Sequence, residues 1–301
     1  MIDAERTEAI ALPRAGVLAP VLGTFNAVAT FSKRKPLGAI GGAITVFLVL
    51  VAILAPTLAP YGDREKAGEV ELAPSTQYFM GTDNVGRDVY SRIIYGARIS
   101  LYVGMGAVLI GVTAGFVLGV TMTYTGGALD MGFQRLVDAL MALPGLIVAL
   151  AIMTVLGPSL NNVIIAIVVG MLAPVIRTVR SQVLTLKELD YVLAARAVGA
   201  SSKRIIFRHI APNCFATYLV LASYYLGFAI ILEAGLSFLG VGSPLDVPSW
   251  GGMLSRANEF HIKTAPWVSI FPGLAIFVVV FGFNILGDAL RDVFDPKLRG
   301  R

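Results

Sequence analysis

The chain contains six long stretches of apolar residues, each close to the length that crosses a membrane as a helix. A spanning helix needs about 20 mostly apolar residues, because the hydrocarbon core of a bilayer is about 30 Å thick. In that core every backbone N–H and C=O group must be bonded within the protein, as an α-helix achieves. The sequence therefore predicts an all-α membrane protein with six transmembrane helices. The six stretches are Leu37–Leu58, Ile99–Tyr124, Leu136–Leu156, Val163–Val179, Phe215–Leu239 and Trp267–Leu286.

The composition agrees with a chain that faces lipid. Of its 301 residues 56% are hydrophobic and 14% charged, and the mean hydropathy is +0.77. Soluble domains carry about 25% charged residues, so this inventory cannot cover a water-facing surface. The single cysteine, Cys214, excludes an internal disulfide framework and offers no metal-binding pattern.

The positions of the basic residues predict the orientation of the spans. With the N-terminus inside, 17 of the 24 Lys and Arg residues fall in inner segments and seven in outer ones. Lys and Arg accumulate on the cytoplasmic side of membrane proteins, so both termini are expected in the cytoplasm. The net charge of +5 thus reflects topology, and no nucleic-acid partner is expected.

The spans divide the chain into segments. We expect the first apolar run to be retained, because it is longer than the apolar part of a cleavable signal peptide. The short connections predict that spans two and three, and three and four, pack as antiparallel neighbours. The expected segments are a cytoplasmic tail (1–36), the first span (37–58), an external loop with an amphipathic helix (59–98), a core domain of five spans (99–290) with an inner loop (180–214) and an outer loop (240–266), and a cytoplasmic tail (291–301).

The inner loop has the pattern of two short helices joined by a sharp turn. Asp190 suits the N-cap of the first helix, and Gly199 suits the left-handed position after its end. Ser201 or Ser202 can cap the second helix, which Pro212 is expected to close. Small side chains on the first helix let another protein approach its backbone, although a solvated amphipathic linker remains an alternative. The residues expected at such a contact are Asp190, Tyr191, Ala194, Ala195, Arg196, Gly199, Ala200 and Ser201.

This loop resembles the EAA motif of bacterial importer permeases of the ATP-binding-cassette class. In that family the motif reads Glu-Ala-Ala, three residues, Gly, nine residues, then Ile-x-Leu-Pro. Four residues keep their places, namely Ala194, Ala195, Gly199 and Pro212, whereas Leu193 stands in the place of the Glu, His209 of the Ile and Ala211 of the Leu. The resemblance implies a coupling helix that sits in a cleft of an ATPase subunit.

The resemblance extends from about Ser32 to Leu298. Over this range the chain is similar to the second (C-type) permease subunit of dipeptide, oligopeptide and nickel importers. It implies a type I importer permease fold in the bacterial inner membrane, and a pathway for di- or oligopeptides. The implied partners are a second homologous permease, two cytoplasmic ATP-binding subunits and an extracytoplasmic substrate-binding protein. The segments that carry it are Ser32–Lys35, Leu54–Tyr61, Gly81–Arg92, Gly96–Leu101, Leu232–Gly240 and Phe283–Asp292.

Two further residues are candidates for a role in gating or in the pathway. Glu233 is an ionisable residue inside a predicted span, where such residues are costly and often functional. Trp250 lies in the outer loop, which is expected to fold back over the mouth of the pathway. A structural role is the alternative for Glu233, which can reach water or satisfy a backbone group near the outer end of its span.

Several motifs are absent from the sequence. It contains no Gly-x-x-x-x-Gly-Lys-Ser/Thr phosphate loop, no metal-binding pair of histidines and no nucleophile–base arrangement. We therefore expect no enzyme activity and no cofactor, with ATP bound by the partner subunits. Nickel, glutathione or another small solute is an alternative cargo. A gradient-driven secondary transporter or channel is the main alternative class, and a membrane receptor or scaffold is another.

Overall fold

The computed structural model describes residues 32, 35–244, 246–256 and 263–294. These residues form helices and loops, and they contain no β-strand beyond one isolated bridge between Thr82 and Asp88. Most of the predicted N-terminal tail, and residues 295–301 of the C-terminal tail, lie outside the described residues. The helices are α2 (Pro36–Ile53), α3 (Ala55–Leu58), α4 (Val89–Thr125), α5 (Gly127–Met141), α6 (Gly145–Leu156), α7 (Leu160–Leu186), α8 (Asp190–Ala197), α9 (Ser202–Ile205), the π-helical turn η1 (Ile206–Ile210), α10 (Ala211–Phe238), α11 (Trp250–Arg256) and α13 (Trp267–Phe294).

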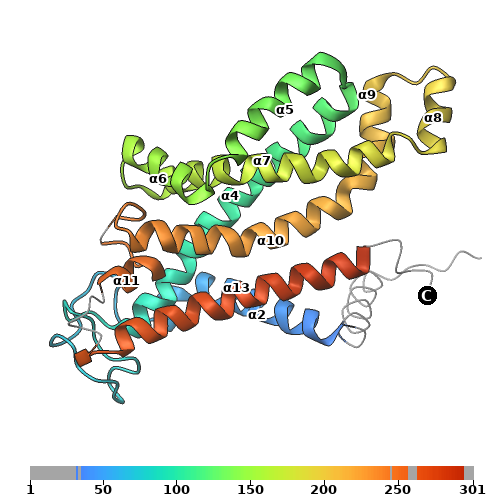
Figure 1. The fold of residues 1–301 in the computed structure, drawn as a ribbon. Helices are drawn as coiled ribbons and strands as arrows, with labels where there is room; N and C mark the ends of the chain where they lie inside the picture. The colour runs from blue at the N-terminus through green and yellow to red at the C-terminus, as the bar shows by residue number, and fades with distance from the viewer. Residues whose placement is uncertain (1–31, 33–34, 245, 257–262, 295–301) are drawn as a thin grey trace, which may run out of the picture.

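Five helical segments of the described chain are long and apolar enough to cross a membrane. They are α2, α4, α7, the α9–α10 run and α13, and they correspond to five of the six predicted spans. The long helices run between two ends of the bundle, the α8 end and the α11 end (Figure 1).

The third predicted span is not a single straight helix. It is divided between α5 and α6, which meet at an angle of 87°. Pro144 stands just before α6 in an extended conformation and cannot donate a backbone hydrogen bond to a preceding turn. The span predicted over Leu136–Leu156 is therefore not one continuous helix, and the described chain has six candidate spans only if the bent pair is counted as one.

The most extensive helix pair is α4 with α7, which are spans two and four. The predicted packing of spans three and four is confirmed, because α6 packs against α7 and Gly145 of α6 lies next to Gly170 of α7, as in an antiparallel pair. The predicted packing of spans two and three is limited to a slight contact between α5 and α4. A Cβ added at Gly106 would meet Ile164, and one at Gly119 would meet Val179. Residue numbers rise together along both helices, so α4 and α7 run parallel.

Glycines on α4 make this close approach possible. A Cβ added at Gly111 would lie 2.6 Å from the Met171 sulfur, and one at Gly115 would lie 2.6 Å from Val175 Cγ1. Small residues four apart on one face let membrane helices approach until their backbones are in van der Waals contact. The glycine repeat of span two thus packs against span four, in agreement with its expected packing role.

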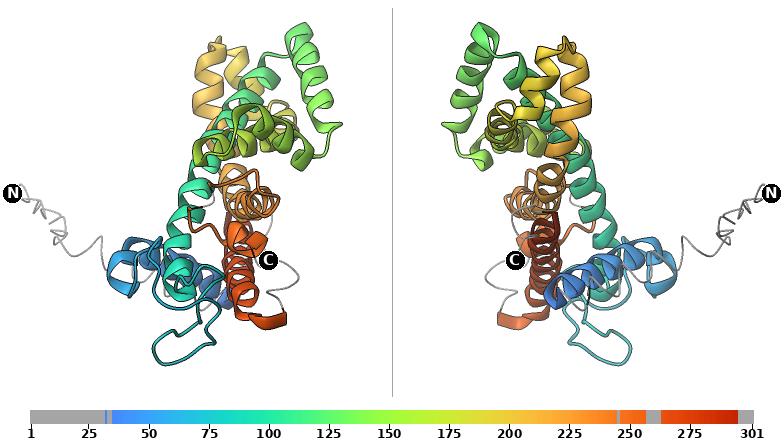
Figure 2. Two further views of the ribbon diagram at one scale, coloured as in Figure 1. Left: turned by 90° about the vertical axis from the view of Figure 1, so that its left-hand side faces the viewer. Right: turned by 90° about the vertical axis from the view of Figure 1, so that its right-hand side faces the viewer.

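A second group of helices completes the bundle. α10 packs against α4, α7 and α13, and α13 packs against α2. Gly41 of α2 allows this last contact, because an added Cβ would lie 2.6 Å from the Gly282 carbonyl oxygen. In the two views of Figure 2, α2 and α5 lie at opposite edges of the bundle.

The segment before span two is continuous with it. α4 begins at Val89, where Asp88 accepts a hydrogen bond from the Ser91 N–H group as an N-cap. The helix then runs for 37 residues, or about 55 Å, so the amphipathic segment expected before residue 98 is the first part of α4. It packs inside the protein, with Ser91 and Arg92 almost inaccessible.

The α4–α7 contact predicts a clear difference between two glycine substitutions. Gly115→Val should destabilise the protein by about 2 kcal/mol, because its Cβ has no room beside Val175. Gly132→Val, on α5, is the matched control, since nothing lies within 4 Å of its Cβ position. Thermal unfolding in detergent should show a lower Tm for Gly115→Val alone, and equal Tm values would contradict the packing.

Candidate functional site

The segment from Asp190 to Ile210, which we call the arm, consists of α8, α9 and η1 and projects from the α8 end of the bundle (Figure 1). Gly199 follows α8 with a φ of +82°, the left-handed conformation that favours glycine, as predicted. Ser201 is the N-cap of α9, and its Oγ accepts from the Arg204 N–H group at 3.4 Å. Asp190 is the first residue of α8 rather than its cap; Leu189 holds that position and makes no side-chain cap, so the predicted cap was wrong.

The arm continues into α10 without a break. Pro212 was expected to close the second helix, but it lies in the first turn of α10, and this prediction was wrong. Proline is tolerated there because the preceding turn is a π-turn, in which the Ala211 N–H group bonds to the Ile206 carbonyl oxygen five residues back. The missing N–H group of Pro212 is thereby accommodated with the helical path intact.

One side of α8 is anchored to the bundle. Val192 is fully buried in the main apolar core. The Arg196 guanidinium carbon lies 5.9 Å from the centre of the Tyr124 ring, within the range of a cation–π contact. The Tyr191 ring lies 6.2 Å from the His209 ring, and partial burial raises the pKa of its phenol. These contacts fix α8 against the ends of α4 and η1.

The other side of α8 is open. Ala194 and Ala197 are exposed, and at helical spacing they lie opposite the buried Val192. Leu193 is 41% exposed and Val198 is 85% exposed. An exposed apolar surface of this kind on a polar segment is typical of a contact with another protein.

The remaining predicted arm residues divide between these two sides. Ala195 and Ala200 pack against the core cluster, whereas Gly199 and Ser201 are exposed. Next to them is a basic surface on α9 and η1, which was not among the site residues predicted from sequence. Lys203, Arg204 and Arg208 are exposed there beside Phe207, which is 74% exposed. Within the described chain these three cations form no ion pair.

At the α11 end, residues 240–244 and 246–256 fold back on α10, and we call this segment the cap. Glu233 is 1% exposed beneath it, and Glu233 Oε1 accepts hydrogen bonds from the hydroxyls of Ser237 at 2.7 Å and Ser243 at 3.1 Å. Trp250 is also buried, and its Nε1 donates to the Ile93 carbonyl oxygen at 3.0 Å. The described part of the outer loop thus folds back on α10. Its position over the mouth of a pathway, and a gating role for Glu233 and Trp250, stay predictions.

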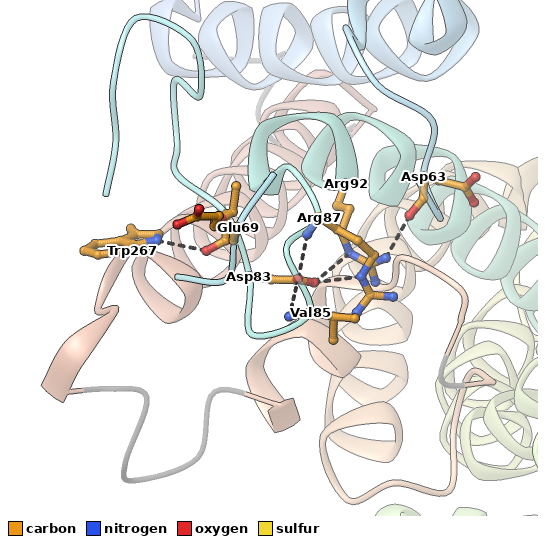
Figure 3. Close-up of polar contacts among 8 residues, drawn as sticks. Asp63, Glu69, Asp83, Val85, Arg87, Arg92 and Trp267 are labelled. Atoms are coloured by element: carbon orange, nitrogen blue, oxygen red, sulfur yellow. Dashed lines mark hydrogen bonds and ion pairs between the residues drawn. The ribbon is translucent and has the colours of Figure 1, made fainter. Parts of the chain in front are cut away.

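A second polar cluster at this end is centred on the buried carboxylate of Asp83 (Figure 3). Asp83 Oδ1 accepts from the Val85 and Arg87 N–H groups at 2.8 and 2.9 Å. Asp83 Oδ2 accepts from Arg87 Nε at 2.9 Å and lies 3.9 Å from Arg92 Nε. Arg92 Nη1 donates to the Asp63 carbonyl oxygen at 2.8 Å, and Trp267 Nε1 donates to the Thr82 carbonyl oxygen at 3.2 Å.

The Asp83 cluster fixes the 59–88 loop against α4 and α13. Asp83, Arg87 and Arg92 belong to the segment Gly81–Arg92 that carries the family resemblance, but no regular spacing in the sequence indicated that they meet around one carboxylate. Among the described residues no group of three or more His, Cys, Asp or Glu side chains could hold a metal ion.

Comparison with known proteins identifies the family. Residues 111–300 match the family described as the binding-protein-dependent transport system inner membrane component. Residues 32–74 match the N-terminal transmembrane domain of oligopeptide transport permease C. The chain therefore belongs to the binding-protein-dependent inner membrane transport components, and it is an inner membrane permease rather than a catalytic enzyme.

Three relatives show where the chain lies within this family. It is 42% identical over 269 residues to the dipeptide transport system permease protein DppC of Alkalihalophilus pseudofirmus, covering 89% of this chain and 88% of that one. It is 40% identical over 261 residues to a putative peptide transport system permease of Brucella suis, covering 85% and 88%. It is 39% identical over 271 residues to the glutathione transport system permease protein GsiD of Pectobacterium atrosepticum, covering 88% and 89%.

The Asp83 cluster predicts the effect of removing its carboxylate. Asp83→Ala leaves two buried guanidinium groups without their shared anion, which should cost about 3 to 5 kcal/mol locally. Limited trypsin digestion of the detergent-solubilised protein should then show faster cleavage at Arg64 and Lys66 in the 59–88 loop.

Asp246→Ala is the control for this digestion. It removes an exposed ion pair with Arg64, and exposed pairs contribute about 0 to 1 kcal/mol. If both variants are cleaved at the same rate, the Asp83 cluster does not hold the loop.

Proposed function

We propose that this chain is one permease subunit of an ATP-driven importer and that the arm couples it to the ATPases. The observation that carries the proposal is the open side of α8, which exposes small and apolar side chains although its other side is firmly packed. Small residues such as Ala194 and Ala197 allow the helix backbone to enter a partner's groove. The family supports the coarser statement, because its members are components of binding-protein-dependent transport systems.

The proposed topology has six spans, with both termini and the arm in the cytoplasm. Because α4 and α7 run parallel, the chain must return along the whole bundle between Thr125 and Leu160. The pair α5–α6 makes this return and so acts as one bent span. The excess of basic residues in the segments at the α8 end supports placing that end inside.

The proposed partners are inferred from the arm, its basic surface and the sequence motifs. Two cytoplasmic ATPases would bind ATP and receive the arm, since the chain has no phosphate-binding loop of its own. Lys203, Arg204 and Arg208 add positive charge beside α8, which favours an ATPase surface with acidic residues. A second homologous permease would form the other half of the pathway, and an external binding protein would deliver the substrate.

The proposed cargo is a di- or oligopeptide. The three relatives named above are described as permeases for dipeptides, peptides and glutathione, and glutathione is itself a short peptide. A nickel importer or another small-solute importer of the same group is the alternative.

The continuity of the arm with α10 supports a direct mechanical link. Movement of α8 by closing ATPases would act on η1 and α10, which run as one helical path from Ser202 to Phe238. That path ends at Glu233 and the cap, so both ends of the bundle are connected through one element.

A substitution on the open side of α8 tests this function. Ala194→Trp adds a large ring to the open side of α8 and should reduce ATP-dependent peptide uptake about tenfold or more in proteoliposomes that contain all partners. Ala128→Trp, at an exposed alanine of α5, is the matched control and should transport normally. The ATP hydrolysis that the substrate-binding protein stimulates should fall together with uptake.

The same assay separates the competing classes. Uptake by this chain alone, driven by an ion gradient without ATPases, would identify a secondary transporter or channel instead. Normal uptake by Ala194→Trp would show that the arm is not the coupling element.

A further inference from the structure

The cap is attached to α10 by a compact polar cluster. Ser243 N–H donates to Ser237 Oγ at 3.0 Å, and the two hydroxyl oxygens are 3.2 Å apart. Both hydroxyls also donate to Glu233 Oε1. Since Glu233 and Ser237 belong to α10 and Ser243 to the cap, one carboxylate oxygen joins the two elements.

The backbone of the cap lies directly on the last turns of α10. A Cβ added at Gly242 would lie 2.3 Å from Ser237 Oγ, and one at Gly251 would lie 2.2 Å from the Ala234 carbonyl oxygen. Only glycine fits at either position, so the cap and α10 touch without an intervening side chain. At these two glycines the backbone of the cap is therefore in direct contact with the backbone of α10.

The cap is also tied to other elements. Trp250 bonds to the Ile93 carbonyl oxygen and fills the space above Gly96 of α4. Asp246 pairs with Arg64 of the 59–88 loop at 2.8 Å, on the exposed surface. A shift of α10 relative to α4 must therefore either carry the cap with it or separate Glu233 from Ser243.

The closed arrangement leaves one strong acceptor unsatisfied. Glu233 Oε2 is inaccessible and accepts no well-formed hydrogen bond among the described residues, although the buried hydroxyl of Ser249 in the cap lies close to the carboxyl group. No described Lys or Arg pairs with this carboxyl group. An unsatisfied buried acceptor is unfavourable, and the penalty is relieved when water reaches it. Separation of the cap from α10 would break the bonds through Oε1 but would hydrate both oxygens, so the two states are closer in free energy than the bonds alone indicate.

We propose that Glu233, Ser237 and Ser243 form a latch that fastens the cap to α10 and releases it when the pathway opens toward the α11 end. This inference rests on the proposed function, in which α10 transmits movement of the arm. Glu233 is a positioning residue, because it acts through the cap and not by contact with the cargo. The latch places the release step at the end of α10 opposite the ATPases.

A reversible cross-link tests the latch. Ser237→Cys/Ser243→Cys in a Cys214→Ala background places two thiols where hydroxyl oxygens are 3.2 Å apart, close enough for a disulfide with little movement. Oxidation should reduce ATP-dependent peptide uptake about tenfold, and a reductant should restore it. The two single-cysteine variants are the controls, and oxidation should not change the uptake of either one relative to its own reduced form.

Each outcome of this experiment bears on the latch. A disulfide confirmed by mass spectrometry with unchanged uptake would show that the cap stays on α10 throughout transport, and the proposal would fail while the importer function stands. Failure of the two cysteines to cross-link would contradict the closed arrangement itself. Absence of ATP-dependent uptake in the unmodified assembly would instead refute the proposed function.

Substitution of Glu233 provides an independent readout. Glu233→Gln keeps an oxygen that accepts from both serine hydroxyls, whereas Glu233→Ala removes it. Glu233→Ala should raise basal ATP hydrolysis and lose most of its stimulation by the binding protein, and Glu233→Gln should restore the stimulation. Equal stimulation in both variants would exclude a latch that depends on this oxygen, because a purely structural role would change assembly and not this ratio.

Discussion

The close contact between α4 and α7 positions every other functional segment of this protein. Glycines on one face of α4 bring the two backbones together, so the pair acts as a rigid unit without large side chains between its members. α4 is long enough to reach both ends of the bundle. It supplies Tyr124 beneath the arm at one end and the Ile93 carbonyl oxygen beneath the cap at the other. The arm and the cap therefore both pack against the same helix, one at each end of the bundle.

Local chemistry made part of this architecture predictable from sequence. The long apolar runs located five spans. Gly199 has the left-handed conformation that a residue without a Cβ adopts readily, and the Ser201 hydroxyl caps α9. Prolines were harder to interpret, because the outcome depends on whether neighbouring groups accommodate the missing N–H group. Pro144 lies in the break between α5 and α6, where the chain bends by 87°, Pro174 lies inside α7, and Pro212 lies in the first turn of α10. Proline therefore has a different structural effect at each of these three positions.

The polar clusters at the α11 end could be predicted only in part. Glu233 stood out because an acidic residue interrupts an apolar run, but its partner Ser243 comes from a loop with no periodic pattern. Asp83 meets Arg87 one turn away in sequence and Arg92 from the first turn of α4, so no single helix or strand period relates them. Contacts of this kind are set by how separate segments fold over one another, and short-range spacing carries no signal for them.

The π-turn at Ile206–Ile210 has a consequence for how α9 and α10 present their side chains. A π-turn holds one residue more than an α-turn, and each residue of an α-helix advances the direction of the side chain by about 100°. A helical wheel drawn with one period from Ser202 to Phe238 therefore assigns residues on one side of the turn to the wrong face by about that angle. The faces of α9 and of α10 must therefore be assigned separately, and a residue exposed on α9 can lie in line with a residue of α10 that a single helical wheel would place on another face.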